Sequence, residues 1–465
     1  MSGCLPYAVI GAGPAGLAAA TAAARAGVEV TVFDEQPSPG GQIFRAIEQV
    51  PAARAGVLGT DYRCGAGLVS DFRASGARYF PDSTVWSVDA TRELGVLRAG
   101  KASLLQAERI LITGGAMERP VPFPGWTLPG VMNAGAGQIL LKSAGLVPAD
   151  GVVLAGTGPL LLLLAWQYVQ AGVTVKALLD VTPWRNWLKA LPKLPAALLA
   201  RHYIVSGLGY QRDLHRAGVR EIHGVSGLQA VGEEQLTAVR FRHRGKSRTI
   251  ETGLLLTHFG LLPHTQLTRD AGCAHDWDDR QVCWRPRVDD WGNSSVPGIG
   301  VAGDNAAIGG ARAAGHAGRL AAFETLRELG WVDTAERDRL AAADRKWLAA
   351  DLRIRPFLET LYRPSPDTLD VEEDATIVCR CEEITAGEIR RALREGHTEV
   401  NQVKYLTRCG MGPCQGRQCG PALAHILAAA QGRPVDAVGA FRIRPPVRPI
   451  TLAQLAALDT AADGG

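Results

Sequence analysis

The sequence contains neither a long apolar stretch nor a block of like charge. Its most apolar run, residues 152–166, includes two glycines and a proline and falls short of the roughly 18 residues that a membrane-spanning helix needs. The 50 Lys and Arg residues nearly balance the 46 Asp and Glu residues, which leaves a net charge of +4 with no basic block. This balance gives no support for nucleic acid or an anionic membrane as a partner.

The N-terminus lacks the composition of a signal peptide. No positive charge precedes its first apolar run, residues 7–10, and that run leads directly into a glycine motif. We therefore expect no secretion signal and a cytoplasmic location.

No Cys-x-x-Cys pair occurs before the C-terminal region, which excludes the dithiol chemistry of disulfide reductases. Four cysteines are scattered, and we expect each to be a small buried apolar residue; these are Cys4, Cys64, Cys273 and Cys283. The other five of the nine cysteines fall within the 41 residues 379–419. In a chain without a secretion signal, such clustering favours metal or redox chemistry over structural disulfides.

Glycine is abundant: 54 of the 465 residues, about 12%, against roughly 7% on average. Such an excess indicates many tight turns and close backbone approaches. The apolar content of 46% and charged content of 21% are those of an ordinary globular protein. At about 150 residues per domain, the length suggests three domains.

A glycine-rich turn joins the first expected strand to the first expected helix. The strand covers residues 7–10, the turn reads Gly11-Ala-Gly-Pro-Ala-Gly16, and Gly27 closes the alanine-rich helix that follows. The next strand, residues 28–33, ends at Asp34. In such a βαβ unit the glycines allow a backbone approach to a pyrophosphate, the helix N-terminus binds the phosphates, and the acid binds ribose hydroxyls.

The same pattern recurs about 145 residues further on. A strand at residues 151–155 leads into Gly156-Thr-Gly-Pro-Leu-Leu161, then come a helix and a strand that ends at Asp180. Here leucine replaces the third glycine, and no arginine follows Asp180 at once to bind a 2′-phosphate. We therefore favour a retained domain that has lost its ligand, with NAD(P) as a doubtful cofactor.

Further positions favour FAD in the first domain. Gly41 and Gln42 follow Asp34 closely, and Asp304 follows Gly303 at a strand end, where it can bond a ribityl hydroxyl. Residues 1–330 resemble the two-dinucleotide-domain flavoproteins that include glutathione and thioredoxin reductases. The resemblance implies FAD, with another adenine nucleotide as the alternative. The expected binding residues are Gly11, Gly13, Pro14, Ala15, Gly16, Asp34, Glu35, Gly41, Gln42, Thr113, Gly114, Gly303 and Asp304.

The cysteine-rich region reads as a small module built around thiolates. Cys379-Arg-Cys381 precedes Thr385 and Glu388, whose spacing is that of a capping box, so a helix begins there and its dipole stabilises the thiolates. The string of residues 408–420 contains three more cysteines. Four thiolates suit a [2Fe–2S] cluster or a structural zinc. The tight Cys-x-Cys and the flavin domain nearby favour the cluster, and cysteines without a metal are the third alternative.

This module resembles the bacterioferritin-associated ferredoxin type, in which a Cys-x-Cys and a later cysteine pair bind the cluster. The resemblance implies that the ligands are Cys379, Cys381, Cys414 and Cys419. Because the later pair is spaced Cys-x4-Cys rather than Cys-x-x-Cys, Cys409 remains a contender for one of the four places.

These patterns predict an α/β fold with two dinucleotide-binding (Rossmann-type) domains, the second inserted in the first, plus a small C-terminal helical [2Fe–2S] domain. The expected boundaries are 1–117 and 258–330 for the FAD-binding domain, 118–257 for the NAD(P)-type domain, 331–372 for a helical connector, 373–435 for the [2Fe–2S] module and 436–465 for an extended tail.

Three strings, residues 34–42, 118–130 and 408–420, resemble one family over nearly the whole chain. It comprises the flavin and iron–sulfur subunits of heteromeric bacterial dehydrogenases, among them opine oxidases, D-hydroxyproline and dye-linked proline dehydrogenases, and hydrogen cyanide synthase. The resemblance implies a partner flavoprotein (β) subunit that oxidises the amine. It also allows an FMN at a subunit interface and a small third subunit.

The chain shows no motif for binding or deprotonating a substrate, so its catalytic residues are unknown. We expect His316, Arg312 and Arg319 to form salt bridges or to pack, and the amphipathic residues 184–220 to pack in the core rather than bind a partner. The proline–arginine tail, residues 442–449, binds along a partner or straps its own domain.

We therefore predict an electron-transfer subunit of an amino-acid or opine dehydrogenase. The alternatives are a self-contained NAD(P)H-dependent reductase and a scaffold subunit with an empty flavin site.

Overall fold

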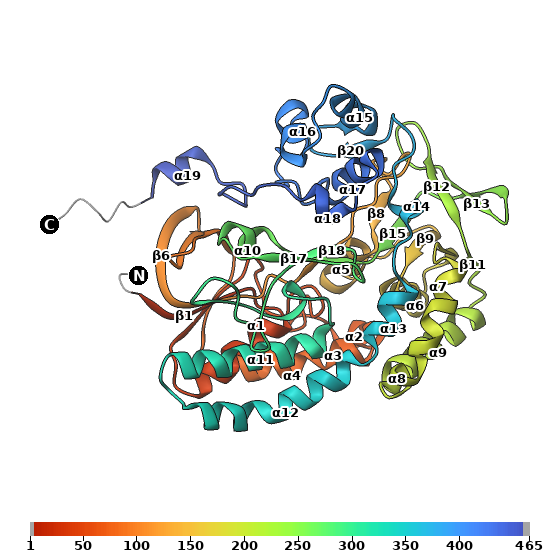
Figure 1. Ribbon diagram of the computed structural model, residues 1–465. Helices are drawn as coiled ribbons and strands as arrows, with labels where there is room; N and C mark the ends of the chain where they lie inside the picture. Colours follow the sequence, from red (N-terminus) through yellow and green to blue (C-terminus); the bar gives the residue numbers. More distant parts are fainter. Residues whose placement is uncertain (1–3, 459–465) are drawn as a thin grey trace.

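The computed structural model describes residues 4–458, and its longest strand organises the first domain (Figure 1). This strand is β6 (Lys101–Ile112). Its second half pairs in parallel with β1 (Leu5–Ile10) and β19 (Ile299–Val301), and its first half pairs antiparallel with β5 (Glu93–Arg98). The order is β3-β2-β1-β6-β5-β4, where the other strands are β2 (Val30–Phe33), β3 (Arg78–Phe80) and β4 (Ser83–Val88). Because β19 comes from late in the chain, the first domain is completed after the second.

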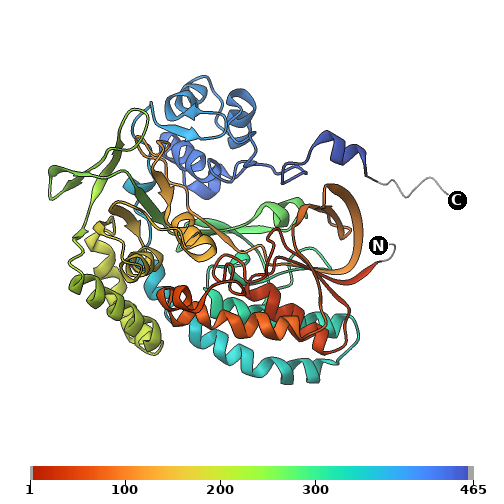
Figure 2. The same ribbon diagram turned by 180° about the vertical axis from the view of Figure 1, so that it is seen from behind.

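A layer of helices covers one face of this sheet (Figure 2). Helix α1 (Pro14–Arg25) packs between α4 (Gly65–Arg73) and α11 (Ala311–Glu328). The backbones of α1 and α11 touch, because a Cβ on Gly318 would lie 2.1 Å from the carbonyl oxygen of Ala15. Alanines along α1 make this close approach possible. The connector helix α12 (Thr334–Leu352) lies against the outer side of α11, with Asp333 as its N-cap.

The second domain is a parallel sheet with the strand order β11-β10-β9-β15-β8. Its β9 (Val152–Thr157), α6 (Pro159–Gln170) and β10 (Val175–Asp180) form the expected second βαβ unit. β15 (Leu255–Phe259) ends two residues past the expected boundary at 257. The remaining elements of the domain are β8 (Val131–Asn133), α5 (Ala134–Ala144), α7 (Trp184–Ala190), α8 (Leu194–Leu198), α9 (Arg201–Arg216), β11 (Glu221–His223), β12 (Ser226–Val231), β13 (Ala238–His243) and β14 (Lys246–Glu251).

The two domains are joined by a pair of strands and share apolar contacts. β7 (Ala116–Glu118) and β16 (Leu261–Pro263) pair antiparallel where the chain crosses from one domain to the other. One hydrophobic cluster contains Phe44 and Tyr62 of the first domain together with Leu161 of the second. Shorter elements around these domains are α2 (Ala52–Leu58), α3 (Thr60–Arg63), α10 (Gln266–Asp270), β17 (His275–Asp278), β18 (Cys283–Pro286), α13 (Arg355–Leu361) and α14 (Pro366–Leu369).

The C-terminal module is mainly helical and has its own hydrophobic core. Its elements are β20 (Ile377–Cys379), β21 (Ile384–Thr385), α15 (Ala386–Arg394), α16 (Val400–Thr407), α17 (Gly420–Gln431) and α18 (Val435–Val438). The capping box of Thr385 and Glu388 begins α15, as the sequence predicts. The module contacts the second domain through Trp126, whose Nε1 donates a hydrogen bond to the carbonyl oxygen of Ile377 at 2.6 Å.

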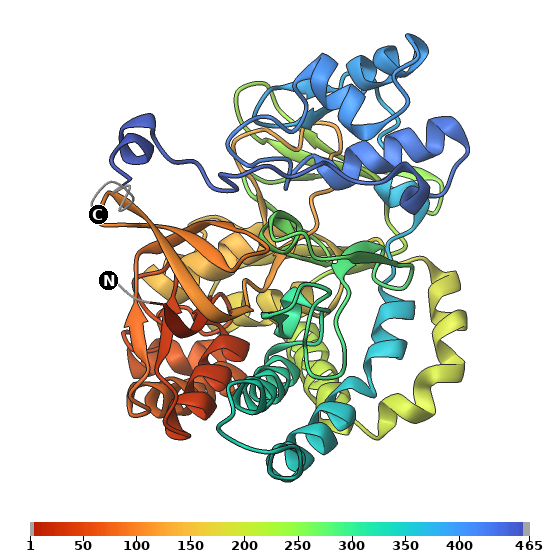
Figure 3. The same ribbon diagram turned by 60° about the vertical axis from the view of Figure 1, so that its left-hand side comes forward.

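The tail crosses from this module to the first domain (Figure 3). The backbone N–H of Val447 donates to the carbonyl oxygen of Trp86 at 2.8 Å, and Arg448 forms an ion pair with Glu35 at 2.6 Å. The short helix α19 (Leu452–Ala456) then contacts β6. Of the two interpretations of the tail, the structure therefore shows the strap over its own chain. The part of the expected tail after residue 458 lies outside the described residues.

Three further expectations have clear outcomes. The prediction that the scattered cysteines are buried is correct for Cys273 and Cys283 but wrong for Cys4 and Cys64, which sit at the exposed start of β1 and of α4. The expected salt-bridging role of the α11 side chains is confirmed, because His316 and Arg319 both pair with Asp344, and Arg312 pairs with Asp351. Within residues 4–458, no helix is both long and apolar enough to cross a membrane.

Candidate functional sites

The turn between β1 and α1 forms a cradle made of backbone. A Cβ on Gly16 would lie 1.9 Å from the carbonyl oxygen of Gly11, so this glycine lets helix and strand touch. Gly13 and Gly41 face each other from different loops, and a Cβ on Gly41 would lie 2.8 Å from the Gly13 Cα. By contrast, a Cβ on Gly13 would meet nothing closer than 4.0 Å, so the cradle is open beside it.

The N-terminus of α1 points into this cradle with unpaired N–H groups. Pro14 stands in the first turn, no side chain caps the helix, and no acidic residue lies in its first turn. These N–H groups and the positive end of the helix dipole are therefore available to an anion. The arrangement fits the pyrophosphate of a dinucleotide.

Asp34 lies at the floor of the same site. Its carboxylate oxygens accept hydrogen bonds from the backbone N–H groups of Ala12, at 2.5 Å, and Gln36, at 2.7 Å. Burial raises the pKa of Asp34, while these two hydrogen bonds and the nearby Arg45 oppose the rise. Each oxygen keeps a lone pair for a ribose hydroxyl. Glu35 points elsewhere, because its side chain is paired with Arg448 of the tail.

The late part of the first domain closes the other end of the cradle. Gly303 has a φ of +70°, and a Cβ there would lie 2.7 Å from that of Ala15. One carboxylate oxygen of Asp304 accepts hydrogen bonds from the backbone of Gly309 and Gly310, at 2.8 and 2.9 Å. These bonds hold the carboxylate in place and leave its second oxygen for a ligand hydroxyl.

Thr113 and Gly114 complete the ring of expected cofactor residues. The Thr113 hydroxyl donates to the carbonyl oxygens of Ile10 and Gly11, at 2.8 and 2.9 Å, which ties the end of β6 to the glycine turn. The N–H of Gly114 donates to the side chain of Asn305 at 2.8 Å. Asn305 is fully buried and was missed by the sequence reasoning, although it directly follows Asp304.

Lys142 is a second residue of this site that no sequence pattern indicated. It comes from α5 of the second domain, and its Nζ donates to the carbonyl oxygen of Gln42 at 3.2 Å and to the side chain of Gln138 at 2.8 Å. Burial lowers the pKa of Lys142 to about 7, with the positive charge of Arg45 acting in the same direction. Arg45 itself donates to the side chain of Gln42 at 2.7 Å.

The second glycine turn keeps its shape and packs against His258. A Cβ on Gly156 would lie 1.8 Å from the carbonyl oxygen of His258, and the His258 ring lies 3.5 Å from the same position on Gly158. Leu161 is buried in the cluster shared with the first domain. Asp180, the expected ribose ligand, is hydrogen-bonded to His223 at 3.0 Å.

The five cysteines of the C-terminal module form a group of three and a pair. The sulfur atoms of Cys379, Cys409 and Cys419 lie within 4.8 Å of one another and are buried. Cys381 is exposed and interacts with Cys414, which is half-buried. Hydrogen bonds from Cys409 and Cys419 lower the pKa of Cys379 to about 2. Such a group of sulfur donors fits an iron–sulfur cluster or another thiophilic metal.

The loop that carries three of these cysteines is shaped by small residues around Phe441. Cβ atoms on Gly410, Gly416 and Gly420 would lie 2.7, 2.5 and 3.2 Å from its ring. A Cβ on Gly412 would lie 2.3 Å from the Cβ of Cys381. Phe441 is buried at the start of the tail, so the tail closes the cysteine loop before it crosses to the first domain.

Both parts of the chain match known protein families. The pyridine nucleotide-disulphide oxidoreductase family model matches residues 5–321, and the sarcosine oxidase A3 domain model matches residues 373–459. An opine oxidase subunit of Agrobacterium tumefaciens is 42% identical over 97% of this chain and 91% of its own length. The chain belongs to the family of these opine oxidase subunits. It forms part of an FAD-dependent oxidoreductase.

Other members and structures agree with this family. Hydrogen cyanide synthase subunit HcnB of Pseudomonas aeruginosa is 34% identical over 98% of this chain and 99% of its own length. The structure of L-proline dehydrogenase from P. horikoshii has the same fold, with a TM-score of 0.70 and 18% identity over 97% of this chain and 79% of that one. The predicted fold class and family are thus confirmed.

Proposed function

We propose that this chain is the electron-transfer subunit of a heteromeric amino-acid or opine dehydrogenase, and that it binds FAD and a [2Fe–2S] cluster. The observation that carries the proposal is the presence, in one chain, of a dinucleotide cradle and a group of three buried thiols with a further thiol pair beside it. A flavin accepts two electrons at once and can release them singly, and an iron–sulfur cluster carries one. Together they suit a relay.

The arrangement of the remaining cysteines supports a relay over a disulfide reductase. Outside the C-terminal module, the four cysteines are Cys4, Cys64, Cys273 and Cys283, and all are free thiols. Cys4 and Cys64 are exposed, and burial raises the pKa values of Cys273 and Cys283, the latter to about 11. A thiol with a raised pKa is a poor nucleophile at neutral pH.

The source of the electrons is proposed to be a partner flavoprotein that oxidises the substrate. The second glycine turn argues against nicotinamide as that source, because Leu161 stands where the first turn has its third glycine. The relatives are themselves subunits, of opine oxidase and of hydrogen cyanide synthase, which supports a partner chain. An FMN at the subunit interface and a small third subunit belong to the same proposal.

We propose Cys379, Cys381, Cys414 and Cys419 as the cluster ligands. The structure brings Cys379 and Cys419 together with Cys409, and Cys381 beside Cys414. Cys409 is the alternative ligand. Cys381 is the exposed member of the set, so its side of the cluster is the proposed point of electron exit.

Expression of this chain alone, and then together with the products of the neighbouring reading frames, tests the proposal. Reduction of a dye is assayed with a panel of amino acids and opines. We expect substrate-dependent reduction from the complex and none from the lone chain. Robust turnover by the lone chain, or rapid bleaching of its flavin by NADH, would overturn the relay.

A further inference from the structure

Helix α7 turns its large apolar side chains outward. They follow the i, i+3, i+4, i+7 spacing of a single helix face, the face that a surface helix normally buries. They are Trp184, Trp187 and Leu188, with Leu191 directly after the helix, and these residues are 66%, 48%, 56% and 54% exposed. The opposite face holds the helix in place, because the side-chain amide of Asn186 donates to the carbonyl oxygen of Leu361 at 3.1 Å and Ala190 is buried. The prediction that this segment packs in the core is therefore wrong.

More exposed apolar side chains follow on the next two helices. Leu198, Leu199, Val205 and Leu208 add four large side chains, all more than half exposed. We call these eight residues, on and between α7, α8 and α9, the apolar ridge. The three helices lie at an outer corner of the molecule, drawn in yellow in Figures 1 and 3. Single exposed apolar residues are ordinary, but eight within 25 residues mark an interaction surface.

The segment that carries this ridge is rich in positive charge. Residues 181–220 contain seven Lys or Arg residues and one acid, Asp213, whereas the whole chain has a net charge of only +4. Arg185, Lys189 and Lys193 lie among the apolar residues of α7 and just after it. The even balance of the whole chain therefore hides a local excess of positive charge along this segment.

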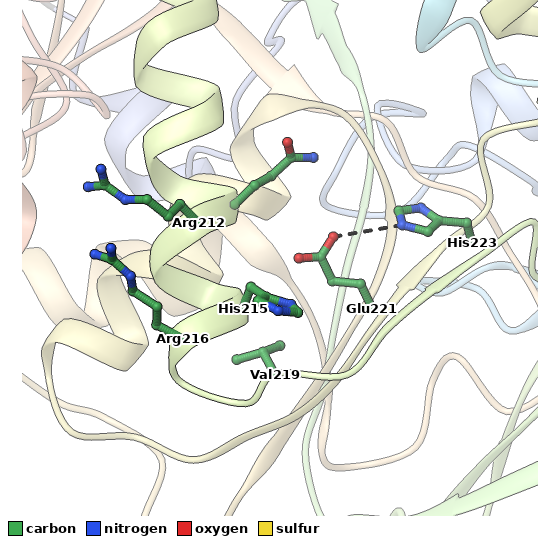
Figure 4. Close-up of a pocket in the computed structure, with 7 residues that line it drawn as sticks. Arg212, His215, Arg216, Val219, Glu221 and His223 are labelled. Atoms are coloured by element: carbon green, nitrogen blue, oxygen red, sulfur yellow. Dashed lines mark ion pairs between the residues drawn. The ribbon is translucent and has the colours of Figure 1, made fainter.

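Two open hollows beside the ridge carry more basic side chains. One, of about 570 Å³, lies at the end of α9, where Arg212 and Arg216 project to the same side of the helix and His215 lies between them and β11 (Figure 4). The other, of about 580 Å³, includes Trp184 of the ridge together with Arg244 and Arg248 of the neighbouring hairpin. Glu221 also lines both hollows and interacts with His223, but the arginines outnumber it and offer donors for an anionic group next to exposed apolar surface.

The combination selects one kind of occupant. A second copy of this chain would bring the same positive surface against the ridge, so self-association is opposed by charge. Tryptophan and leucine with interspersed Lys and Arg match the boundary of an anionic lipid layer, where the apolar groups enter the headgroup region and the cations meet the phosphates. We propose that the apolar ridge seats this protein on an anionic lipid surface. The proposal is independent of the proposed function, because no cofactor takes part in the contact.

Vesicle flotation of the purified full-length protein, with any subunits that co-purify, tests this contact. We expect it to float with phosphatidylcholine vesicles that contain about 30 mol% phosphatidylglycerol, and to float at least about tenfold less with phosphatidylcholine alone. Raising the NaCl concentration to about 0.5 M is expected to release most of the protein, because screening weakens the charge contact. No flotation with anionic vesicles would overturn the proposal.

Two variants distinguish lipid binding through the ridge from nonspecific adsorption to vesicles. Trp187→Ser combined with Leu188→Ser is expected to reduce flotation at least about tenfold, since both side chains are exposed and belong to the ridge. Trp347→Ser on α12 is the matched control, because Trp347 is 52% exposed but lies outside the ridge. Its flotation, FAD content and iron content are expected to equal those of the wild type.

The outcomes are distinct from those of the relay test. Wild-type flotation by the double variant would overturn the proposal. The proposal would also be overturned if the wild type did not bind vesicles and the double variant lost a co-purifying subunit. The ridge would then be a subunit interface. Loss of FAD or iron from the wild type would leave flotation unchanged and would bear only on the relay.

Discussion

Lys142 of the second domain donates a hydrogen bond to the carbonyl oxygen of Gln42 in the first, at 3.2 Å. This contact joins α5 to the loop that carries Gly41, the glycine that faces Gly13 across the dinucleotide cradle. Lys142 is almost completely buried, and burial lowers its pKa to about 7. The second domain thus helps to position the loop of the first that carries Gly41.

The buried lysine predicts an unusual dependence of stability on pH. Its folded-state pKa of about 7 lies below the ordinary 10.5, so between these values the unfolded chain binds more protons than the folded one. The lysine's contribution to the free energy of unfolding therefore rises as the pH rises through this window, by up to about 1.4 kcal/mol per pH unit.

Lys142→Met should remove this contribution. The difference in free energy of unfolding between the variant and the wild type is expected to shift in favour of the wild type from about pH 7 to about pH 9.5, as measured by urea titration. The control is Lys176→Met, whose amine donates to the backbone of Glu251 at the surface. If the difference in free energy of unfolding between Lys142→Met and the wild type stays constant over this range, folding does not lower the pKa of Lys142.

Gly13→Val tests the dinucleotide cradle. The backbone φ of Gly13 is −78°, and a Cβ there has open space, so the variant is expected to fold. The isopropyl group would, however, occupy the space beside the helix N-terminus that a pyrophosphate needs. FAD released by acid is expected to fall at least about tenfold, since the phosphates lose their N–H contacts. Gly67→Ala in α4, which also has open space around it, should keep its flavin.

Two single substitutions test which cysteines bind the cluster. Cys414→Ala is expected to lose iron and acid-labile sulfide, whereas Cys409→Ala is expected to retain most of both. The two residues are five positions apart in one loop, so each serves as the control for the other. The reverse pattern would make Cys409 a ligand in place of Cys414.

Phe441→Ala tests how the tail supports the cysteine loop. The variant leaves a cavity against Gly410, Gly416 and Gly420, and a buried Phe→Ala change costs about 3–5 kcal/mol. We expect earlier thermal unfolding of the module and a fall in bound iron. Tyr405→Ala, on the exposed face of α16, should change the stability by less than about 0.5 kcal/mol. If both variants bind equal amounts of iron, the tail does not support the cysteine loop.

The sequence by itself determined the features that depend on neighbours along the chain. Both glycine turns, the capping box at Thr385 and the ends of the first strands lie where their local patterns place them. A tight turn needs a residue that tolerates a positive φ, and a helix start needs a side-chain acceptor. Both requirements are met within a few residues, so spacing is enough to recognise them.

The tertiary structure decided which distant residues meet. Lys142 donates a hydrogen bond to Gln42, and Phe441 packs against the glycines of the cysteine loop. Cys409 lies beside Cys379 and Cys419. The tertiary structure also left the apolar face of α7 in solvent, although the same spacing would serve a buried helix equally well. Amphipathic spacing defines a face but not what covers it, because burial depends on the neighbours that the rest of the chain brings.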